Sequence, residues 1–466
     1  MKKKMLAILI VITLLFVTGC GSKKEDATAG SDGSAVFTSK EKRDGGSASG
    51  KDALSVTSKE GSSAEFKADT AETPAAGMVF GIGETMDGTY ETEAPSTDAI
   101  DADDFMGPLE RARDITAGVL TAGEWNDNHN WGFFTNLVTK GQLTFPSFQL
   151  SPLNRVVVNV TNDIGPVKNA KVVLYNNEGN ILWESVTDYQ GTAYAFYQVS
   201  NSKGSPASVT VSKDGISETQ ILDITANQGN EDGQQRQQDQ QGNAAIVKSD
   251  VVLVTLGSVS DLKALDLMFM FDTTGSMGDE LLYLQKEFED IAQRVSDQST
   301  RYSVNFYRDH GDAYVVKAND FTSDIDEVMR QLNNEYADGG GDYPEAVDKA
   351  LYNAVYDHVW NKESVKLLFL ILDAPPHSGE QVNDTLKLAI TEAARQGIRI
   401  IPIASSGVDK ETETFLRTAA ILTGGTYTFL TDHSGVGNSH LEPTIGSYQV
   451  ELLNDCIVRL IDQYYQ

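Results

Sequence analysis

Three oxygen-bearing side chains follow an apolar run in the second half of the chain. The run covers residues 265–271, and Asp272, Thr274 and Ser276 come directly after it at alternate positions. Carboxylate and hydroxyl oxygens are the ligands that hard divalent cations such as Mg²⁺ prefer. Because hydroxyls are neutral, they leave a bound cation with spare positive charge for a carboxylate that arrives from outside. The spacing therefore indicates a metal-dependent binding surface rather than a catalytic centre.

The elements around this motif must form a sheet that places the motif at an edge. Strands are expected at 265–271, 302–307, 314–316, 366–372, 398–403 and 427–430, and helices at 280–295, 325–333, 345–359, 384–396, 411–422 and 445–464. This alternation predicts an α/β fold, a doubly wound and mainly parallel sheet with an antiparallel edge strand at 314–316. Continuous apolar runs are typical of strands buried on both faces. Ligands bind such sheets at the carboxyl ends of central strands, where Asp272 and Asp373 both fall.

Three segments give the chain a resemblance to a known family. They are Asp272-x-Thr274-x-Ser276, the loop Gly339-Gly-Gly-Asp-Tyr-Pro-Glu345, and Asp373 after Leu370-Ile-Leu. Together, from about residue 262 to the end, they resemble the von Willebrand factor type A (vWA) domain, which has a Rossmann-like sheet and a metal-ion-dependent adhesion site (MIDAS). The resemblance implies that Thr274 and Ser276 bind the cation through their hydroxyls. It also implies that Asp272 and Asp373 act mainly through water.

The third ligand of the family site is not obvious in this sequence. The family supplies a threonine from the second loop, and no threonine lies in 339–345. Counting back from the expected helix start puts Tyr343 at that position, whereas counting from the glycines puts Asp342 there. A carboxylate is a better ligand for Mg²⁺ than a phenol, so Asp342 joins the predicted metal site. Tyr343, Glu345 and His377 are predicted rim residues, and Glu345 also suits a helix N-terminus for structural reasons. The expected cation is Mg²⁺, with Mn²⁺ or Ca²⁺ as alternatives.

The N-terminus carries the features of a secretory signal. A basic start at 1–4 precedes a short apolar stretch and small residues before Cys20. The sequence Leu15-Phe-Val-Thr-Gly-Cys20 resembles the end of a bacterial lipoprotein signal peptide. That resemblance implies that Cys20 is lipidated, with acyl chains such as palmitate, and that the protein is anchored in a cell membrane or outer surface facing away from the cytoplasm.

The rest of the chain divides by composition. A tether rich in small and polar residues lacks the apolar side chains needed for a core and is expected to be disordered. Short β-rich runs with turn residues between them predict a small all-β, Ig-like sandwich that resembles carboxypeptidase-regulatory-like modules, which implies a spacer or accessory role. The predicted organisation is a signal peptide at 1–19, a tether at 20–104, an aromatic-rich connecting segment at 105–150, the sandwich at 151–225, a Gln/Asn-rich linker at 226–245 and the vWA domain at 246–466.

Charge and motif content narrow the function. With 37 Lys and Arg against 67 Asp and Glu, the formal net charge is −30, which disfavours nucleic acid as a partner. His310 and His377 are accompanied by no nucleophile, zinc-protease signature or phosphate loop, so no enzyme is expected. The sequence thus predicts a membrane-anchored lipoprotein that binds a protein partner, through an acidic side chain, at a divalent cation. A metal-independent scaffold or assembly factor of the cell envelope is the alternative, followed by a metal-dependent hydrolase.

Overall fold

The computed structural model describes residues 115–145, 149–200, 204–222, 248–260, 264–295 and 299–465. The predicted signal peptide at 1–19, the predicted lipidation site Cys20, the predicted tether at 20–104 and the predicted linker at 226–245 lie outside the described residues. In the part of the chain that is described, no helix combines the length and the apolar composition that crossing a bilayer requires.

An eight-stranded sheet forms the centre of the C-terminal part, in the order β11-β10-β9-β12-β13-β14-β1-β15. Neighbouring strands from β10 to β14 pair in parallel, and β11, β1 and β15 are antiparallel to their neighbours. The predicted α/β fold with a mostly parallel sheet and an antiparallel edge is therefore confirmed. The strands are β1 Thr121–Trp125, β9 Ala264–Asp272, β10 Thr300–Tyr307, β11 Val316–Lys317, β12 Ser364–Leu372, β13 Ile398–Ala404, β14 Tyr427–Leu430 and β15 Glu451–Leu452.

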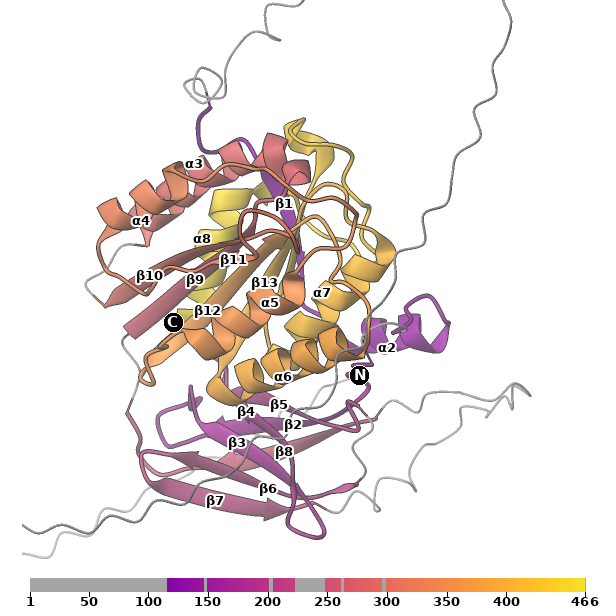
Figure 1. The fold of residues 1–466 in the computed structure, drawn as a ribbon. Helices are drawn as coiled ribbons and strands as arrows, with labels where there is room; N and C mark the ends of the chain where they lie inside the picture. Colours follow the sequence, from indigo (N-terminus) through magenta and orange to yellow (C-terminus); the bar gives the residue numbers. More distant parts are fainter. Residues whose placement is uncertain are drawn as a thin grey trace, which may run out of the picture. The chain divides into compact units, whose positions relative to one another are not determined.

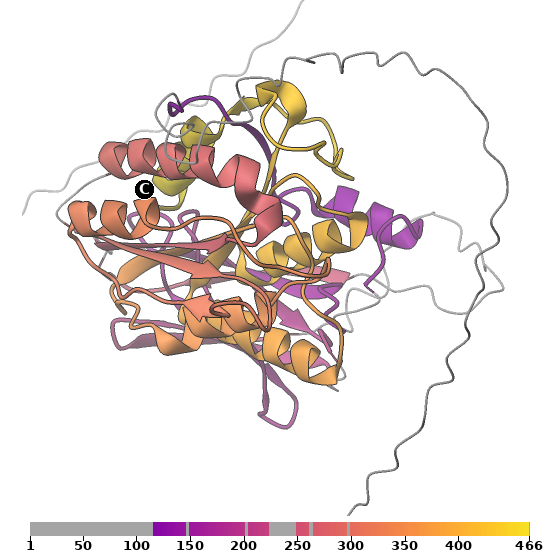
Figure 2. The same ribbon diagram turned by 45° about the horizontal axis from the view of Figure 1, so that its top comes forward.

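Helices cover both faces of this sheet (Figure 1), and the turned view in Figure 2 shows them on either side of the strands. The side chains of β9 point alternately to the two faces of the sheet. Phe269 packs in the hydrophobic cluster that includes α3, α4 and α8, and Met268 packs in the cluster that includes α5, α6 and α7. Phe269 also stacks on Phe369 of β12, with ring centroids 4.8 Å apart. The helices are α3 Gly278–Arg294, α4 Ile325–Asn333, α5 Val347–Tyr352 with the π-helical turn Asn353–Asp357, α6 Glu380–Gln396, α7 Lys410–Thr423 and α8 Leu453–Tyr465.

The aromatic-rich segment before the β-rich region differs from its prediction as a connector. Its first part is β1, which lies between β14 and β15 in the large sheet, and its second part includes helix α2, Trp131–Thr139. A buried ion pair ties the segment to the large domain, because Arg417 of α7 bonds both carboxylate oxygens of Asp127 at 2.8 and 2.7 Å. Residues 121–127 are therefore part of the same core as the domain that starts more than a hundred residues later.

The β-rich region forms two further sheets, one of three strands and one of four. Trp183 of β4 packs edge-on against Phe196 of β5, so the two sheets share a core. Strand β8 pairs in parallel with β2, which differs from the predicted domain order, where residues 246–255 led into the vWA domain. The likeness to carboxypeptidase-regulatory-like modules stays a prediction. The strands are β2 Asn154–Thr161, β3 Lys171–Asn176, β4 Ile181–Val186, β5 Thr192–Tyr197, β6 Pro206–Lys213, β7 Ile216–Ile221 and β8 Lys248–Thr255.

The C-terminal helix is shorter than the predicted 445–464. Helix α8 begins at Leu453, and the two residues before it form β15 against β1. The reason is a pairing that sequence periodicity does not reveal, since the partner strand lies more than three hundred residues upstream.

Candidate functional site

The first loop of the site follows β9 and brings a carboxylate and two hydroxyls together. Oδ1 of Asp272 accepts hydrogen bonds from the Thr274 amide at 2.9 Å and the Thr274 hydroxyl at 2.7 Å. The Thr274 hydroxyl lies 3.3 Å from that of Ser276. Asp272 and Thr274 are buried and Ser276 is exposed, so the group extends from the sheet edge to the surface. The alternate spacing seen in the sequence thus places all three oxygens on one side of the turn.

Neighbouring loops hold this turn in place. The Thr273 hydroxyl bonds the carbonyl of Tyr307 at 3.0 Å and the hydroxyl of Tyr314 at 2.8 Å. The Gly275 amide donates to the carbonyl of Gly339 at 3.2 Å, and the Asp338 amide donates to the carbonyl of Thr273 at 3.0 Å. Both the end of β10 and the glycine loop at 338–341 are therefore fixed against the first loop.

The glycine loop can pass the site only because its residues lack a Cβ. Gly339 and Gly340 have φ values of 80° and 76°, and a Cβ on Gly339 would lie 2.5 Å from Cγ of Asp312. Asp312 in turn accepts a hydrogen bond from the Gly340 amide at 2.9 Å. A Cβ on Gly340 would lie 3.3 Å from Oε1 of Glu345 and 3.4 Å from Cβ of Thr274. Glu345 and Thr274 therefore both pack against Gly340.

Glu345, predicted at the rim, is the carboxylate of the second loop that lies buried beside Thr274. Glu345 is 3% exposed, whereas Asp342 is exposed and has no hydrogen bond or ion pair to the described side chains of the site. The positive φ values of the two glycines turn the backbone so that the loop presents Glu345 inward. Tyr343 points elsewhere: its hydroxyl donates to the carbonyl of Gly407 at 2.9 Å and accepts from the Asp409 amide at 3.1 Å.

Asp373 completes the cluster from the end of β12. It is 4% exposed, and its proximity helps to raise the pKa of Asp272. The loop that follows Asp373 is joined to the second loop, because the Glu345 amide donates to the carbonyl of Pro375 at 2.9 Å. Asp272, Asp373 and Glu345 thus converge from three separate loops at the carboxyl edge of the sheet.

The three carboxyls are buried and incompletely paired. Oδ2 of Asp272, Oδ1 of Asp373 and Oε2 of Glu345 each lack a hydrogen-bond partner within the described structure. Burial, together with the negative charge of Asp272, raises the pKa of Glu345 to about 9. Burial likewise raises the pKa of Asp272 and of Asp373, and each of the two also feels a neighbouring carboxylate. Unpaired buried carboxylates are costly, so this arrangement is expected to take up protons or a cation.

A divalent cation fits this donor set. Carboxylate oxygens without partners and the two hydroxyls beside them are hard ligands, of the type that Mg²⁺, Mn²⁺ and Ca²⁺ accept. The described side chains that contact one another or face one another's charge in this set are Asp272, Thr274, Ser276, Glu345 and Asp373, and the exposed Asp342 stays a predicted ligand.

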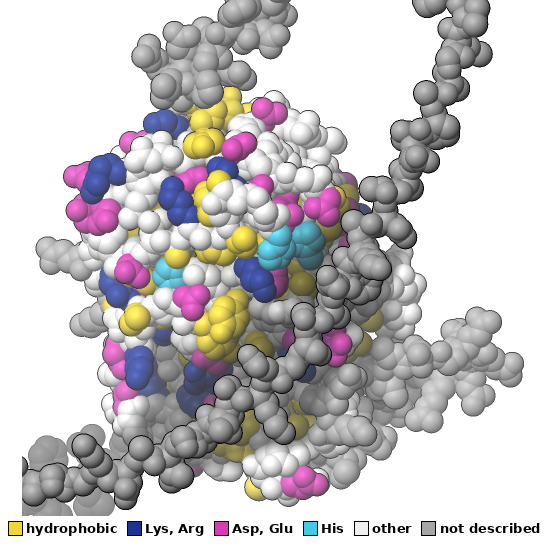
Figure 3. Space-filling model, viewed as in Figure 1, with side chains coloured by type: hydrophobic (Ala, Val, Ile, Leu, Met, Phe, Trp, Pro, Cys, Tyr) yellow, Lys and Arg dark blue, Asp and Glu magenta, His cyan; other side chains and the backbone are white. Residues whose placement is uncertain are grey.

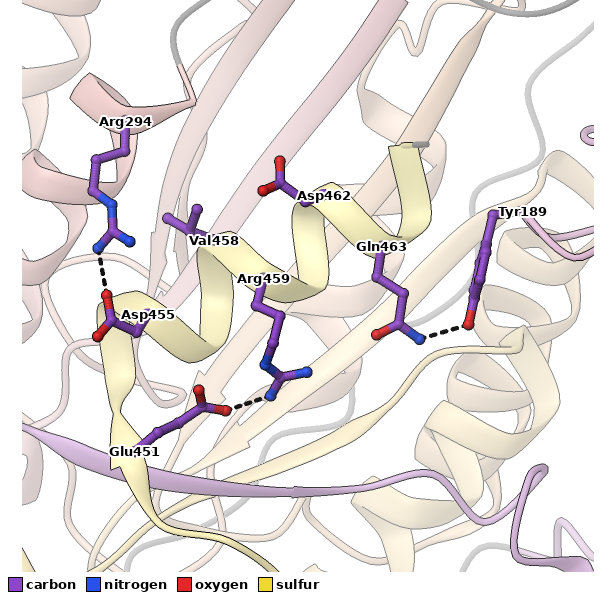
Figure 4. Close-up of a pocket in the computed structure, with 8 residues that line it drawn as sticks. All are labelled: Tyr189, Arg294, Glu451, Asp455, Val458, Arg459, Asp462 and Gln463. Carbon is purple, nitrogen blue, oxygen red and sulfur yellow. Dashed lines mark hydrogen bonds and ion pairs between the residues drawn. The ribbon is translucent and has the colours of Figure 1, made fainter.

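A cavity elsewhere in the domain shows no such donor set. It has a volume of about 580 Å³ and lies along α8 (Figure 4). Its two arginines are paired with carboxylates, Arg294 with Asp455 and Arg459 with Glu451, and Asp462 is a third carboxylate in the lining. The glutamine at its far end, Gln463, donates to the Tyr189 hydroxyl at 2.7 Å. Because arginines neutralise two of its three carboxylates, the cavity is a weaker cation site than the loop cluster.

The fold and this edge define a class of protein domain: a mainly parallel α/β sheet that carries an oxygen-lined site on three loops. Residues 266–437 match the family model of the von Willebrand factor A domain, so this part of the chain is a vWA domain. That match leaves out β1, β15 and α8, which the structure nevertheless places in the same sheet and helical layer.

Two similar proteins illustrate how far the likeness reaches. A protein of Acanthamoeba polyphaga mimivirus described as ariadne-like RING finger protein R811 is 29% identical over 184 residues, which cover 35% of this chain and 18% of that protein. This chain therefore spans under a fifth of that relative's length. The crystal structure of conserved hypothetical protein BatB from Bacteroides thetaiotaomicron shares 13% identity, with a TM-score of 0.32, over 43% of this chain and 98% of that one.

Proposed function

We propose that this protein binds a protein partner through a divalent cation held at the edge of its vWA domain. The observation that carries the proposal is the group of three buried carboxyls, each with an unpaired oxygen, beside the hydroxyls of Thr274 and Ser276. Mg²⁺ is the proposed cation, and Mn²⁺ or Ca²⁺ would find the same ligands. When bound, the cation would supply an open coordination position for an oxygen ligand from the partner.

The charge of the site shapes the choice of partner. Glu345 is an acidic residue in the loop from which the family supplies a neutral threonine, and its carboxyl has a pKa of about 9. If Glu345 keeps its proton, Asp272 and Asp373 balance a divalent cation; if Glu345 ionises, the site carries net negative charge. If Glu345 ionises, the pull on a partner's carboxylate is weaker than it would be with a neutral ligand in its place. We therefore propose an acidic partner side chain as the completing ligand, bound with modest strength.

The location of the protein also belongs to this proposal. The N-terminal residues resemble a lipoprotein signal peptide ending at Cys20, which supports attachment to the outer side of a membrane by acyl chains. The two-sheet module at 154–255 would then serve as a spacer or accessory domain. The vWA domain is a binding module in this proposal, because its site is a set of oxygen ligands for a cation that would leave a position open to a partner group.

The test combines cation binding with partner binding. Calorimetry with Mg²⁺ is expected to show binding to the wild type and none to an Asp272→Ala/Ser276→Ala variant, while Asp342→Asn, a change at an exposed site, serves as the matched control. Partner capture from envelope extract is then compared in Mg²⁺ and in chelator. A partner captured equally by wild type and double variant, in chelator as in Mg²⁺, would refute the cation mechanism and support the metal-independent scaffold instead.

A further inference from the structure

A second group of potential metal ligands lies beside the carboxylate site and is not part of it. Asp309, His310 and His377 each offer a ligand atom, and these atoms all lie within 4.8 Å of one another. Oδ1 of Asp309 is 2.6 Å from Nε2 of His377, and the two imidazole rings have centroids 5.4 Å apart. Histidine side chains reach the surface on the face drawn in Figure 3, so an ion from solution has access to such groups.

The backbone holds these three residues close to one another before any metal binds. The Asp309 amide donates to Oδ2 of Asp312 at 3.0 Å, which fixes the turn after β10. On the other side, Pro376 forms a bridge with Glu345, and His377 follows it directly. Both loops are therefore held against the loop at 339–345, because Asp312 accepts a hydrogen bond from the Gly340 amide at 2.9 Å and Pro376 bridges Glu345. A site formed in this way loses little conformational entropy when it binds an ion.

We propose that Asp309, His310 and His377 form a binding site for Zn²⁺ or a chemically similar transition-metal ion. Two imidazoles and one carboxylate are the set that such ions prefer, whereas Mg²⁺ and Ca²⁺ prefer oxygens alone. Metal–nitrogen distances of about 2.0–2.1 Å in tetrahedral geometry require ligand atoms roughly 3.3 Å apart. The present separations reach this value if the exposed His310 rotates and the Asp309–His377 hydrogen bond opens. Three protein ligands leave a fourth position for water or a partner group.

The two sites are neighbours with different ligand chemistry. Asp309 lies close enough to Glu345 to help raise its pKa, and His377 shares a loop with Asp373. A cation at the histidine site would neutralise part of the negative charge that Glu345 experiences. The proposal does not depend on occupancy of the carboxylate site, because none of its three ligands belongs to that site.

Titration of the untagged full chain with Zn²⁺ in excess Mg²⁺ tests this proposal. Isothermal titration calorimetry is expected to show one zinc event in the wild type, with a Kd raised at least about tenfold in His310→Ala and in His377→Ala. His433→Ala removes another exposed histidine and is expected to leave the event unchanged. The Asp272→Ala/Ser276→Ala variant should also retain it, which separates this site from the proposed magnesium site.

Co²⁺ in place of Zn²⁺ gives a second readout, because its visible absorption reports nitrogen and oxygen ligands directly. Circular dichroism confirms that each variant is folded, and His310→Ala is the more informative change because His310 is exposed. Zinc binding of equal strength in wild type and both histidine variants would overturn the proposal. So would the absence of any zinc event in the wild type.

Discussion

Replacement of Glu345 by glutamine distinguishes the role of its protonated carboxyl from the role of its ionised carboxylate. Burial and Asp272 raise the pKa of Glu345 to about 9, so without a cation the carboxyl holds a proton at pH 7. Glutamine closely resembles a protonated glutamate in shape and charge. The Glu345→Gln protein in chelator is therefore expected to be about as stable as the wild type at pH 7, within about 1 kcal/mol. Its cation binding should nonetheless be weakened, because an amide cannot supply an anionic ligand.

The size of the effect follows from the pKa. At pH 7 the ionisation of a group with a pKa of about 9 costs about 2.7 kcal/mol, and this cost falls as the pH approaches 9. If the cation binds ionised Glu345, the affinity of the wild type for Mg²⁺ should rise by up to about tenfold per pH unit from pH 7 to 9. The Glu345→Gln variant should lose this dependence, so that its deficit is larger at pH 9 than at pH 7.

Calorimetry in two buffers with different ionisation enthalpies counts the protons that leave when the cation binds. At pH 8 the wild type is expected to release about one proton per Mg²⁺, because Glu345 is still mostly protonated there. Asp272 and Asp373 contribute little at this pH, since their pKa values are raised only to about 7 and about 6. Glu345→Gln should release almost none, and Asp342→Asn should behave as the wild type does.

Two results would refute this reasoning. One is equal proton release by the wild type and Glu345→Gln, which would mean that Glu345 does not ionise on binding. The other is loss of Mg²⁺ binding in Asp342→Asn with full binding in Glu345→Gln, which would restore Asp342 as the ligand that the glycine count in the sequence suggests.

Three further outcomes are expected. In chelator, the raised pKa of Glu345 means that the folded protein holds its proton more tightly than the unfolded chain does. This difference stabilises the fold fully below about pH 4.5, and the stabilisation is lost as the pH rises to about 9. Urea denaturation at pH 5, 7 and 9 should therefore show a falling free energy of unfolding, and saturating Mg²⁺ should flatten the fall; a rise with pH would contradict the assignment. Arg417→Met leaves the buried carboxylates of Asp127 and Glu413 without their guanidinium, so the free energy of unfolding should fall by about 3–5 kcal/mol in the same assay. Arg459→Met, the control at a partly exposed pair, should lower it by less than about 1 kcal/mol. A chain that starts at residue 126 lacks β1 but keeps Asp127 and the two-sheet module, and it should unfold at a lower temperature than one that starts at residue 115. Equal melting temperatures would show that β1 is dispensable.

The parallel core of the domain could be predicted because its signals are local. The continuous apolar runs in β9 and β12 are typical of strands buried on both faces, and the helices between strands carry regular periodicity. Strand β1 carries no such signal. It has five residues, Thr-Ala-Gly-Glu-Trp, and its partners in β14 are about three hundred residues away in sequence. Nothing within a local window distinguishes such a strand from an ordered loop.

The site was predictable to the extent that it depends on strand ends. Asp272 and Asp373 follow apolar runs, and parallel strands bring those ends to one edge. The choice between Asp342 and Glu345 depends instead on the path of the loop through Gly339 and Gly340, whose left-handed conformations no count of residues can reveal. A glutamate at a helix start also has an ordinary structural explanation. The signal that could have favoured Glu345 is chemical: it is the other carboxylate in a loop that lacks the expected threonine.

The position of β1 determines how the domain would respond to mechanical load. The chain enters β1 beside the end of β14, where the Thr431 amide bonds the Thr121 carbonyl at 2.9 Å, and this is the edge that carries the candidate site. Just upstream, the amides of Gly118, Val119 and Leu120 all donate to the buried carboxylate of Glu287 in α3. Tension between a partner at the site and the upstream chain would therefore pass along one edge and bypass the two-sheet module. To pull β1 out along its axis, the force must shear its pairing with β14 and β15 together, so the strand acts as a clamp.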